Sequence, residues 1–290
     1  MCSIAGLYTW DKQALKLTQR RAFAATALVA GESRGPHSGG VFTGLKLLKR
    51  VGRPSEFAPE ISTTALTDFG DEILLVHTRY GTHGKLDLPH AHPFALEDGA
   101  VMMHNGVVDG PKVDGYPYQT DLDSELLGAQ ILRNGLEAAA KAISGGAAIA
   151  IWTPAGGKAK HGTLMLYRDS NPLVIAQFDG GMAFASTYEQ LHAACNAAGI
   201  VPYKEGSLPN GYGVKLRLDR IIHEWKHVLM GVRHYRTVTH LCGASDAAKY
   251  GATTQKTGGA AFGDDEEETA TGQSANWQHL TGRRGYTGTN

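Results

Sequence analysis

Cys2 is a candidate nucleophile because of its position in the chain. Removal of Met1 would place a thiol and a free α-amino group on the same residue. In model peptides the amine titrates near ~8 and the thiol near ~8.5, so the amine can act as the base for the thiol. The alternative is a small apolar residue at the start of a strand, and the Met-Cys pair alone favours that alternative.

Other chemically capable residues lie further along the first half of the chain. Arg79 follows an apolar run, where it is either a ligand or a surface arginine that ends a strand. Asn105-Gly106 alone is typical of a hairpin turn. Asp123 fits a helix N-cap, and Asp121 competes with it for that role or for ligand binding. Taken singly, each of these signals is weak.

Eight short segments follow one another in an order that resembles the type 2 glutamine amidotransferases, whose glutaminase domain uses an N-terminal nucleophile. They span roughly the first two thirds of the chain, and the set is far more specific than any member. The segments are 1–6 (MCSIAG), 34–40 (RGPHSGG), 77–84 (HTRYGTHG), 91–94 (AHPF), 104–106 (HNG), 123–125 (DSE), 168–173 (RDSNPL) and 184–186 (FAS).

This resemblance implies hydrolysis of L-glutamine to glutamate and ammonia through a thioester on Cys2. The Asn105 side chain and the Gly106 N–H would stabilise the oxyanion. Arg79 would bind the α-carboxylate of glutamine through its two-pronged guanidinium, and Asp123 would pair with the α-ammonium. No metal or organic cofactor is needed for this step.

Three further residues of the matched segments are expected to shape the substrate site rather than react: Thr82, His83 and Arg34. One position departs from the family pattern. His37 stands where the family usually has an acidic residue, which puts the packing around the Arg34 turn in doubt. The nucleophile and the oxyanion hole do not include this position, so the predicted activity is retained.

The clustered histidines offer a competing interpretation. The spacing of His90, His92 and Glu97 after Gly84 resembles the first motif of the metal-binding cupins, and such residues suit a transition metal. The second cupin motif is absent downstream, and the amidotransferase resemblance accounts for the same histidines. We therefore expect no metal site.

Two alternatives keep the same fold. A stand-alone amidohydrolase could cleave another γ-glutamyl amide, or a catalytically inactive protein could serve as a scaffold or regulatory subunit. Well-known fused members of the family carry an acceptor domain after the glutaminase, whereas here only a short tail remains. We therefore expect a separate synthetase or transferase to accept the ammonia, and leave a homo-oligomer open.

The elements that must position these residues follow from apolar patterning. Helices and runs of strands alternate, which favours layered α+β packing, and the resemblance implies a four-layer α/β/β/α sandwich of two mostly antiparallel sheets. Glycine is abundant, 37 of 290 residues, which favours a loop-rich fold. We predict strands at 3–9, 39–48, 72–78, 146–153, 162–168, 173–178, 182–186 and 212–218, and helices at 11–31, 121–133, 135–143 and 188–198.

Composition divides the chain and limits its function. We expect a glutaminase domain over 1–245 and a flexible acidic and Gly-Thr-rich tail over 246–290, with 277–284 either a docking peptide or disordered. The formal net charge of zero argues against nucleic-acid binding. Cys195 and Cys242 are expected to be inert. Without a signal peptide or a long apolar run, we expect a cytoplasmic protein outside the membrane.

Overall fold

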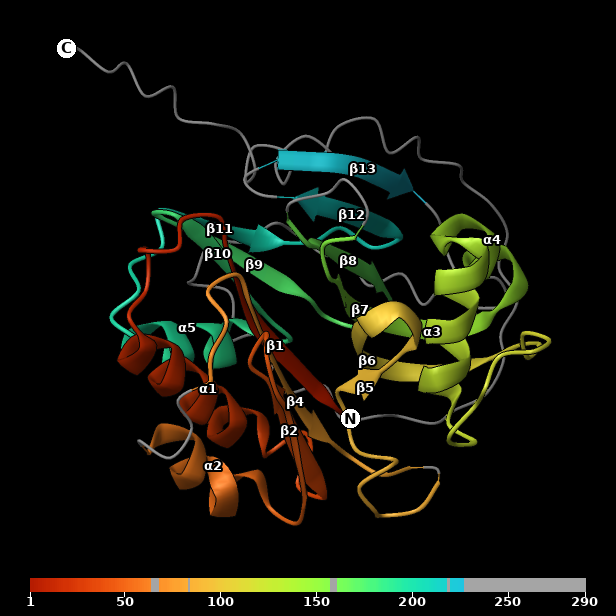
Figure 1. Ribbon diagram of the computed structural model, residues 1–290, viewed down its shortest axis with the longest axis horizontal. Helices are drawn as coiled ribbons and strands as arrows, with labels where there is room; N and C mark the ends of the chain where they lie inside the picture. Colours follow the sequence, from red (N-terminus) through yellow and green to blue (C-terminus); the bar gives the residue numbers. More distant parts are fainter. Residues whose placement is uncertain (64–67, 83, 157–160, 218–219, 227–290) are drawn as a thin grey trace, which may run out of the picture.

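The computed structural model describes residues 1–63, 68–82, 84–156, 161–217 and 220–226, and their strands form two sheets (Figure 1). All strand pairings within the sheets are antiparallel. The seven-stranded sheet has the order β11 (Lys204–Ser207), β9 (Val174–Phe178), β10 (Gly181–Ala185), β1 (Ser3–Thr9), β4 (Ile73–Arg79), β2 (Ser38–Phe42) and β3 (Leu47–Val51).

The second sheet has six strands and packs against the first. Its order is β13 (Arg220–Lys226), β12 (Tyr212–Arg217), β8 (Thr163–Asp169), β7 (Ser144–Thr153), β6 (Val101–Asp109) and β5 (Phe94–Ala95). A short 3₁₀ helix at Glu97–Gly99 links its last two strands. Helices cover the outer faces: α1 (Leu17–Gly31), α2 (Pro54–Ser62) and α5 (Tyr188–Ala197) on the first sheet, α3 (Asp123–Asn134) and α4 (Leu136–Ala142) on the second.

Alternation along the strands explains the layers, because successive side chains of a strand point to opposite faces. Ile4 and Tyr8 of β1 enter the core between the sheets, whereas Leu7 enters the core under the helices. In β6, Met103 faces the other sheet and Met102 faces α3. Strands buried on both faces need nearly continuous apolar sequence, as β1 has. The four-layer α/β/β/α sandwich is confirmed.

Most predicted elements are present, with three corrections. The expected strand 39–48 is a hairpin of β2 and β3, in which the Thr43 N–H donates to the Lys46 carbonyl at 2.8 Å. The helix expected over 11–31 begins only at Leu17. The hairpin-turn interpretation of Asn105-Gly106 is wrong, because β6 runs straight through both residues and pairs them with β7.

Strand register brings the amino terminus to the junction of the two sheets. Ser3 pairs with Thr78, so Cys2 lies opposite Arg79 at the end of β4. The His77 ring nitrogen Nε2 contacts the His104 carbonyl at 3.0 Å, which connects β4 to β6 across the two sheets. Figure 1 places the N-terminus at this junction. The predicted tail 246–290, with its candidate docking peptide, lies outside the described residues.

The helices of the described residues are short relative to a bilayer or too polar for it. None of them is long and apolar enough to cross a membrane.

Candidate active site

Cys2 is half-buried just before β1, and its backbone and side chain are both held. Its thiol contacts the Tyr80 carbonyl, with 3.8 Å between sulfur and oxygen. The Arg34 Nε donates to the Cys2 carbonyl at 3.2 Å. Burial raises the pKa of the thiol, while a backbone hydrogen bond at Tyr80 and the charges of the amino terminus and Arg79 lower it. The thiol therefore lies within the electrostatic influence of a buried arginine.

The start of β1 is fixed by hydrogen bonds to the segment that follows β10. The Ile4 N–H donates to Ser186 Oγ at 3.0 Å, and the Ser186 N–H donates back to the Ile4 carbonyl at 2.8 Å. Ser3 Oγ donates to Gln190 Oε1 at 2.6 Å, and Gln190 Nε2 donates to the Ala27 carbonyl of α1. Gln190, which sequence reasoning missed, thus connects the first strand to two helices.

Arg79 is the last residue of β4 and only 3% exposed, so the alternative of a surface arginine is wrong. Its Nη1 donates to the Lys85 carbonyl at 3.1 Å. Burial lowers the pKa of Arg79, and the negative charges of Cys2, Asp123 and Asp87 raise it. A buried guanidinium with acidic neighbours can bind a carboxylate through two parallel hydrogen bonds.

Asn105 is 1% exposed and carries an unsatisfied donor. Among the described residues no atom accepts a hydrogen bond from its Nδ2. A buried donor without an acceptor costs about 1–3 kcal/mol, so its presence calls for an explanation. A donor of this kind is available to the oxygen of a bound molecule.

Gly106 follows in β6 and brings the backbone of β6 very close to β7. A Cβ at this position would lie 2.0 Å from the Gly146 carbonyl oxygen, and the residue has a φ of +154°. Only glycine fits this approach. The sequence Asn-Gly is therefore explained by close packing of two strands, whereas local turn geometry plays no part.

Asp123 opens α3 and links that helix to β6. Its Oδ2 accepts from the Val108 N–H at 3.0 Å, and its Oδ1 accepts from the Ser124 N–H at 2.8 Å. Its charge also acts on Cys2 and Arg79. Asp121 instead exposes 79% of its side chain and pairs with His90 at 3.0 Å. Asp123 is thus the carboxylate that shares a site with the cysteine and the arginine.

The Arg34 turn packs directly on the end of β4. A Cβ on Gly35 would lie 2.4 Å from the backbone of Thr78, so glycine permits this contact. The imidazole of His37 takes part in the same packing, since the Gly81 N–H donates to its Nδ1 at 3.0 Å. Its ring lies 4.7 Å from that of Tyr80. The turn is therefore well packed with a histidine at this position.

The remaining predicted residues contribute less to the described geometry. Thr82 is exposed, and His83 and Cys242 lie outside the described residues. Cys195 is buried in α5, where burial raises the pKa of its thiol to about 12. That thiol stays protonated near neutral pH, as expected for an inert cysteine.

His92 of the cupin-like motif is buried together with His77 and His104, whereas His90 and Glu97 of that motif pair with Asp121 and Arg133. His77 and His92 stack with 4.2 Å between ring centroids, and burial lowers the pKa of His77 to about 3. The His104 Nδ1 contacts Ser124 Oγ at 3.0 Å. In the part of the chain that the structure describes, no group of three or more His, Cys, Asp or Glu residues could hold a metal ion.

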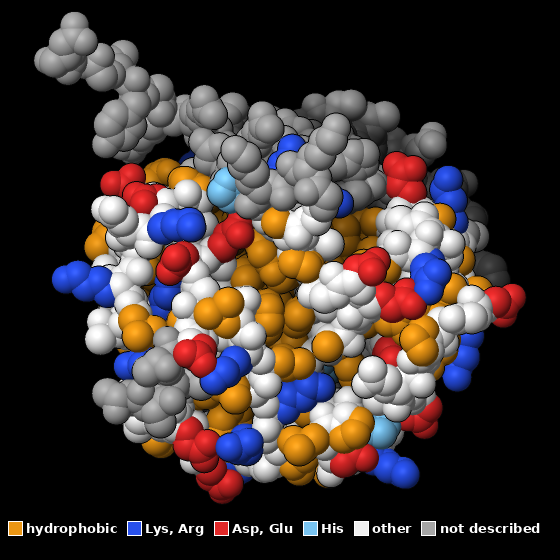
Figure 2. Space-filling model, in the orientation of Figure 1, with side chains coloured by type: hydrophobic (Ala, Val, Ile, Leu, Met, Phe, Trp, Pro, Cys, Tyr) orange, Lys and Arg blue, Asp and Glu red, His pale blue; other side chains and the backbone are white. Residues whose placement is uncertain are grey.

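The surface around the amino terminus is hollowed. Figure 2 shows hydrophobic side chains along the hollow and Lys or Arg side chains at its lower end, near the place where Figure 1 marks the N-terminus. A hollow that combines apolar walls with a cationic end suits a small amphipathic molecule with an anionic group.

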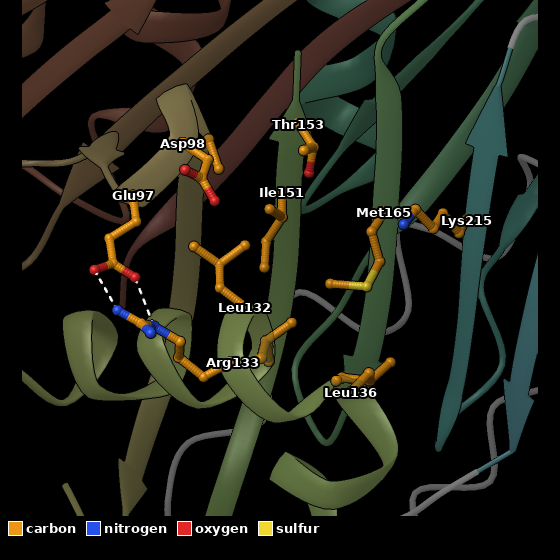
Figure 3. A pocket seen from close by; sticks show the side chains of 12 residues that line it. Glu97, Asp98, Leu132, Arg133, Leu136, Ile151, Thr153, Met165 and Lys215 are labelled. Carbon is orange, nitrogen blue, oxygen red and sulfur yellow. Dashed lines mark hydrogen bonds and ion pairs between the residues drawn. The ribbon is translucent and has the colours of Figure 1, made fainter. Parts of the chain in front are cut away.

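A separate pocket of about 750 Å³ lies between the six-stranded sheet, α3 and α4 (Figure 3). Its floor is apolar, and the ion pair of Arg133 with Glu97 stands at its edge. None of the predicted site residues lines it. The lining residues are Glu97, Asp98, Ala100, Ile131, Leu132, Arg133, Gly135, Leu136, Ile151, Thr153, Met165 and Lys215.

The chain is similar to known proteins over part of its length. No protein-family profile matches the chain. Glutamine–fructose-6-phosphate aminotransferase (isomerizing) of Thermus thermophilus is 29% identical over 174 residues, which cover 53% of this chain and 28% of that protein. The Xylella fastidiosa protein of the same name is 28% identical over 180 residues, or 55% of this chain and 28% of that protein. The chain therefore matches less than a third of the length of these relatives.

Among solved structures, glutamine phosphoribosylpyrophosphate amidotransferase from B. subtilis, complexed with ADP and GMP, has a TM-score of 0.55 to this chain. The sequence identity is 17%, and the alignment covers 78% of this chain and 49% of the other. At this identity the likeness supports the fold alone.

Proposed function

Because the chain belongs to the type 2 glutamine amidotransferase family, we propose that it hydrolyses L-glutamine with Cys2 as the nucleophile. One observation carries the proposal beyond the resemblance. The thiol of Cys2 lies among Arg79, Asp123 and the fixed end of β4. A buried amide donor that has no acceptor among the described residues lies on β6 of the facing sheet. In the proposed mechanism these groups supply the nucleophile, two charges of opposite sign for the substrate and a donor for the oxyanion.

The charges suit the amino-acid end of the substrate. Arg79 binds the α-carboxylate and Asp123 binds the α-ammonium, so the two together distinguish glutamine from a simple amide. Both groups are held by backbone contacts, Arg79 to the Lys85 carbonyl and Asp123 to the Val108 and Ser124 N–H groups. Groups held in advance lose little conformational freedom when the substrate binds.

The chemical steps begin after removal of Met1, which frees the α-amine of Cys2. The amine takes the thiol proton, and the sulfur attacks the side-chain carbonyl carbon of glutamine. The carbonyl oxygen becomes an oxyanion, which accepts hydrogen bonds from Asn105 Nδ2 and the Gly106 N–H. The intermediate then expels ammonia, which receives the proton from the α-ammonium of Cys2, and a thioester remains.

Water completes the cycle. The α-amine of Cys2 removes a proton from water as the oxygen attacks the thioester carbonyl. The second tetrahedral intermediate is bound by the same two donors, and its collapse returns the proton to the sulfur. Glutamate leaves and the thiol is restored. Each step uses this chain's own residues together with glutamine and water.

We also propose that a separate synthetase or transferase accepts the ammonia, and that residues 1–245 form the glutaminase while 246–290 form a tail. The relatives are named glutamine–fructose-6-phosphate aminotransferases, so they transfer nitrogen to an acceptor, which supports an acceptor for the ammonia. A cytoplasmic location fits the two free cysteines among the described residues, Cys2 and Cys195, because reducing compartments keep thiols unpaired.

The test is a steady-state assay of glutamate release from glutamine, with wild type, Cys2→Ala and Cys195→Ala side by side. We expect turnover by wild type and Cys195→Ala, and loss of turnover in Cys2→Ala. Full activity of Cys2→Ala would refute the mechanism. A processed wild type that releases glutamate only from another γ-glutamyl amide would correct the substrate, and an unprocessed inactive wild type would favour a scaffold.

A further inference from the structure

The peptide group that joins Tyr80 to Gly81 is hydrogen-bonded at both of its ends. Its carbonyl oxygen contacts the Cys2 sulfur at 3.8 Å. Its N–H donates to His37 Nδ1 at 3.0 Å. The peptide group is planar, and its C=O and N–H point in opposite directions. The imidazole that fixes the N–H therefore also determines the direction of the carbonyl that meets the thiol.

His37 is itself held in place. Its N–H donates to the Arg79 carbonyl at 3.0 Å, and its carbonyl accepts from the Gly52 N–H at 2.9 Å. Its ring packs against the ring of Tyr80 at 4.7 Å with 37° between the planes. Main chain and ring are thus both fixed, so the position of Nδ1 is set by the fold.

We propose that His37 is a positioning residue for Cys2, acting through the Tyr80–Gly81 peptide, and that it acts only in its neutral form. The inference rests on the proposed function of Cys2 as the nucleophile. To accept from the Gly81 N–H, Nδ1 must carry a lone pair, which assigns the proton to Nε2. Protonation of the ring turns Nδ1 into a donor that faces another donor. The Tyr80 carbonyl is then no longer held in its direction toward the Cys2 thiol.

Charged and titratable groups lie on the segments packed around His37. Arg79 and Tyr80 lie at and after the end of β4, Arg34 lies on the same turn, and Cys2 precedes β1. Glu32 and Arg53, next to the backbone partner of His37, pair with each other at 3.5 Å. A second carboxylate, Glu56, lies close to Gly52, since a Cβ on Gly52 would be 3.5 Å from its Oε2.

Two variants separate the effect of the hydrogen-bond acceptor at Nδ1 from the effect of ring packing against Tyr80. His37→Asn offers an amide oxygen near the position of Nδ1 and does not titrate. His37→Phe keeps a ring against Tyr80 and removes the acceptor. His192→Asn is the matched control, because His192 lies on α5 and pairs with Glu205 at 2.8 Å, away from Cys2.

The first measurement is kcat and KM for glutamine from about pH 5.5 to about pH 8.5, a range in which histidines change charge. At the alkaline end we expect His37→Phe to lose about three- to tenfold in kcat, the equivalent of one hydrogen bond, with a smaller change in KM. His37→Asn should recover most of that loss. As the pH falls, the ratio of its kcat to that of wild type should rise.

The second measurement separates this inference from the proposed function. The rate of Cys2 alkylation by iodoacetamide, read from the mass of the N-terminal peptide, needs no glutamine turnover. We expect a changed rate in His37→Phe. The thiol's own ionisation makes the rate pH-dependent in every variant, so the comparison is the ratio of the wild-type rate to the His37→Asn rate, which should fall as the pH falls. If wild type does not hydrolyse glutamine, the proposed function fails and the alkylation rates still decide the role of His37.

Two results would overturn the inference. One is an acid limb in His37→Asn identical to that of wild type, in both turnover and alkylation. The other is a His37→Phe variant that folds and matches wild type in both assays. Should His37→Phe fail to fold, the pH profiles of His37→Asn decide the question. His192→Asn should follow wild type throughout.

Discussion

Replacement of Asn105 by alanine tests the oxyanion site, because the expected effects on rate and on stability differ. The Asn105 Nδ2 is buried and has no acceptor among the described residues. If it binds the oxyanion, its loss should reduce kcat by about 10²–10³, which corresponds to about 2.7–4 kcal/mol of transition-state stabilisation. KM should change little, since the ground-state carbonyl carries less charge than the oxyanion.

The effect on folding should be small and can be bounded from the structure. Removal of an unsatisfied buried donor should raise the free energy of unfolding by about 1–3 kcal/mol, and the lost packing of a small side chain should lower it by a similar amount. We therefore expect the free energy of unfolding to stay within about 1 kcal/mol of wild type. An asparagine with a structural role would show the opposite pattern, a large loss of stability and a near-normal kcat.

The assay is glutamate release with purified Asn105→Ala, alongside denaturant unfolding of the same preparation. Asn134→Ala is the control, because Asn134 is exposed on α3 and donates to Gln130 at 2.7 Å. We expect the control to keep wild-type kcat. A folded Asn105→Ala with kcat within about threefold of wild type would refute the oxyanion role, because a lost donor costs far more than that.

Three further predictions follow from the described geometry. Arg79→Lys should reduce kcat/KM for glutamine by about 10- to 100-fold, because an ammonium cannot form the paired contacts of a guanidinium; an unchanged value in a glutamate-release assay would exclude Arg79 as the carboxylate ligand. Gly106→Ala should destabilise the fold by more than about 2 kcal/mol in urea unfolding, since its Cβ would lie 2.0 Å from the Gly146 carbonyl oxygen. A variant with wild-type stability would contradict the close approach of β6 and β7. The free energy of unfolding should decrease as the pH falls below about 6.5, because burial lowers the folded-state pKa of His77 to about 3 and only the unfolded chain takes up a proton at His77 above that value. A free energy of unfolding that stays constant down to about pH 4 would contradict a neutral buried His77.

Strands with continuous apolar sequence were predictable, and those with a misleading local signal were not. The run 3–9 is buried along its whole length and forms β1 within the predicted bounds. Strand β6 was missed because Asn105-Gly106 suggests a turn, yet pairing with β7 imposes extended backbone on both residues. Helix α2 was missed because its two prolines suggest breaks, although Pro54 stands at the helix start, where the missing N–H costs nothing.

The candidate site also divides into residues that the sequence identifies and contacts that it does not. The resemblance to the amidotransferases predicted Cys2, Arg79, Asn105 and Asp123 as site residues. The contacts that hold the site join segments far apart in sequence, such as Ser3 to Gln190 at 2.6 Å. No local pattern encodes such contacts. The departure at His37 was visible in the sequence, but its contact with the Gly81 N–H depends on how the Arg34 turn packs against β4.

The most direct test of the central claim is the mass of the purified protein before and after incubation with a diazo-ketone analogue of glutamine. The account predicts a starting mass without methionine, and after incubation a single covalent adduct that peptide mapping assigns to Cys2. Cys195, whose buried thiol has a pKa of about 12, should remain unmodified. Retention of Met1 with no adduct, or an adduct elsewhere in the chain, would contradict an N-terminal cysteine nucleophile.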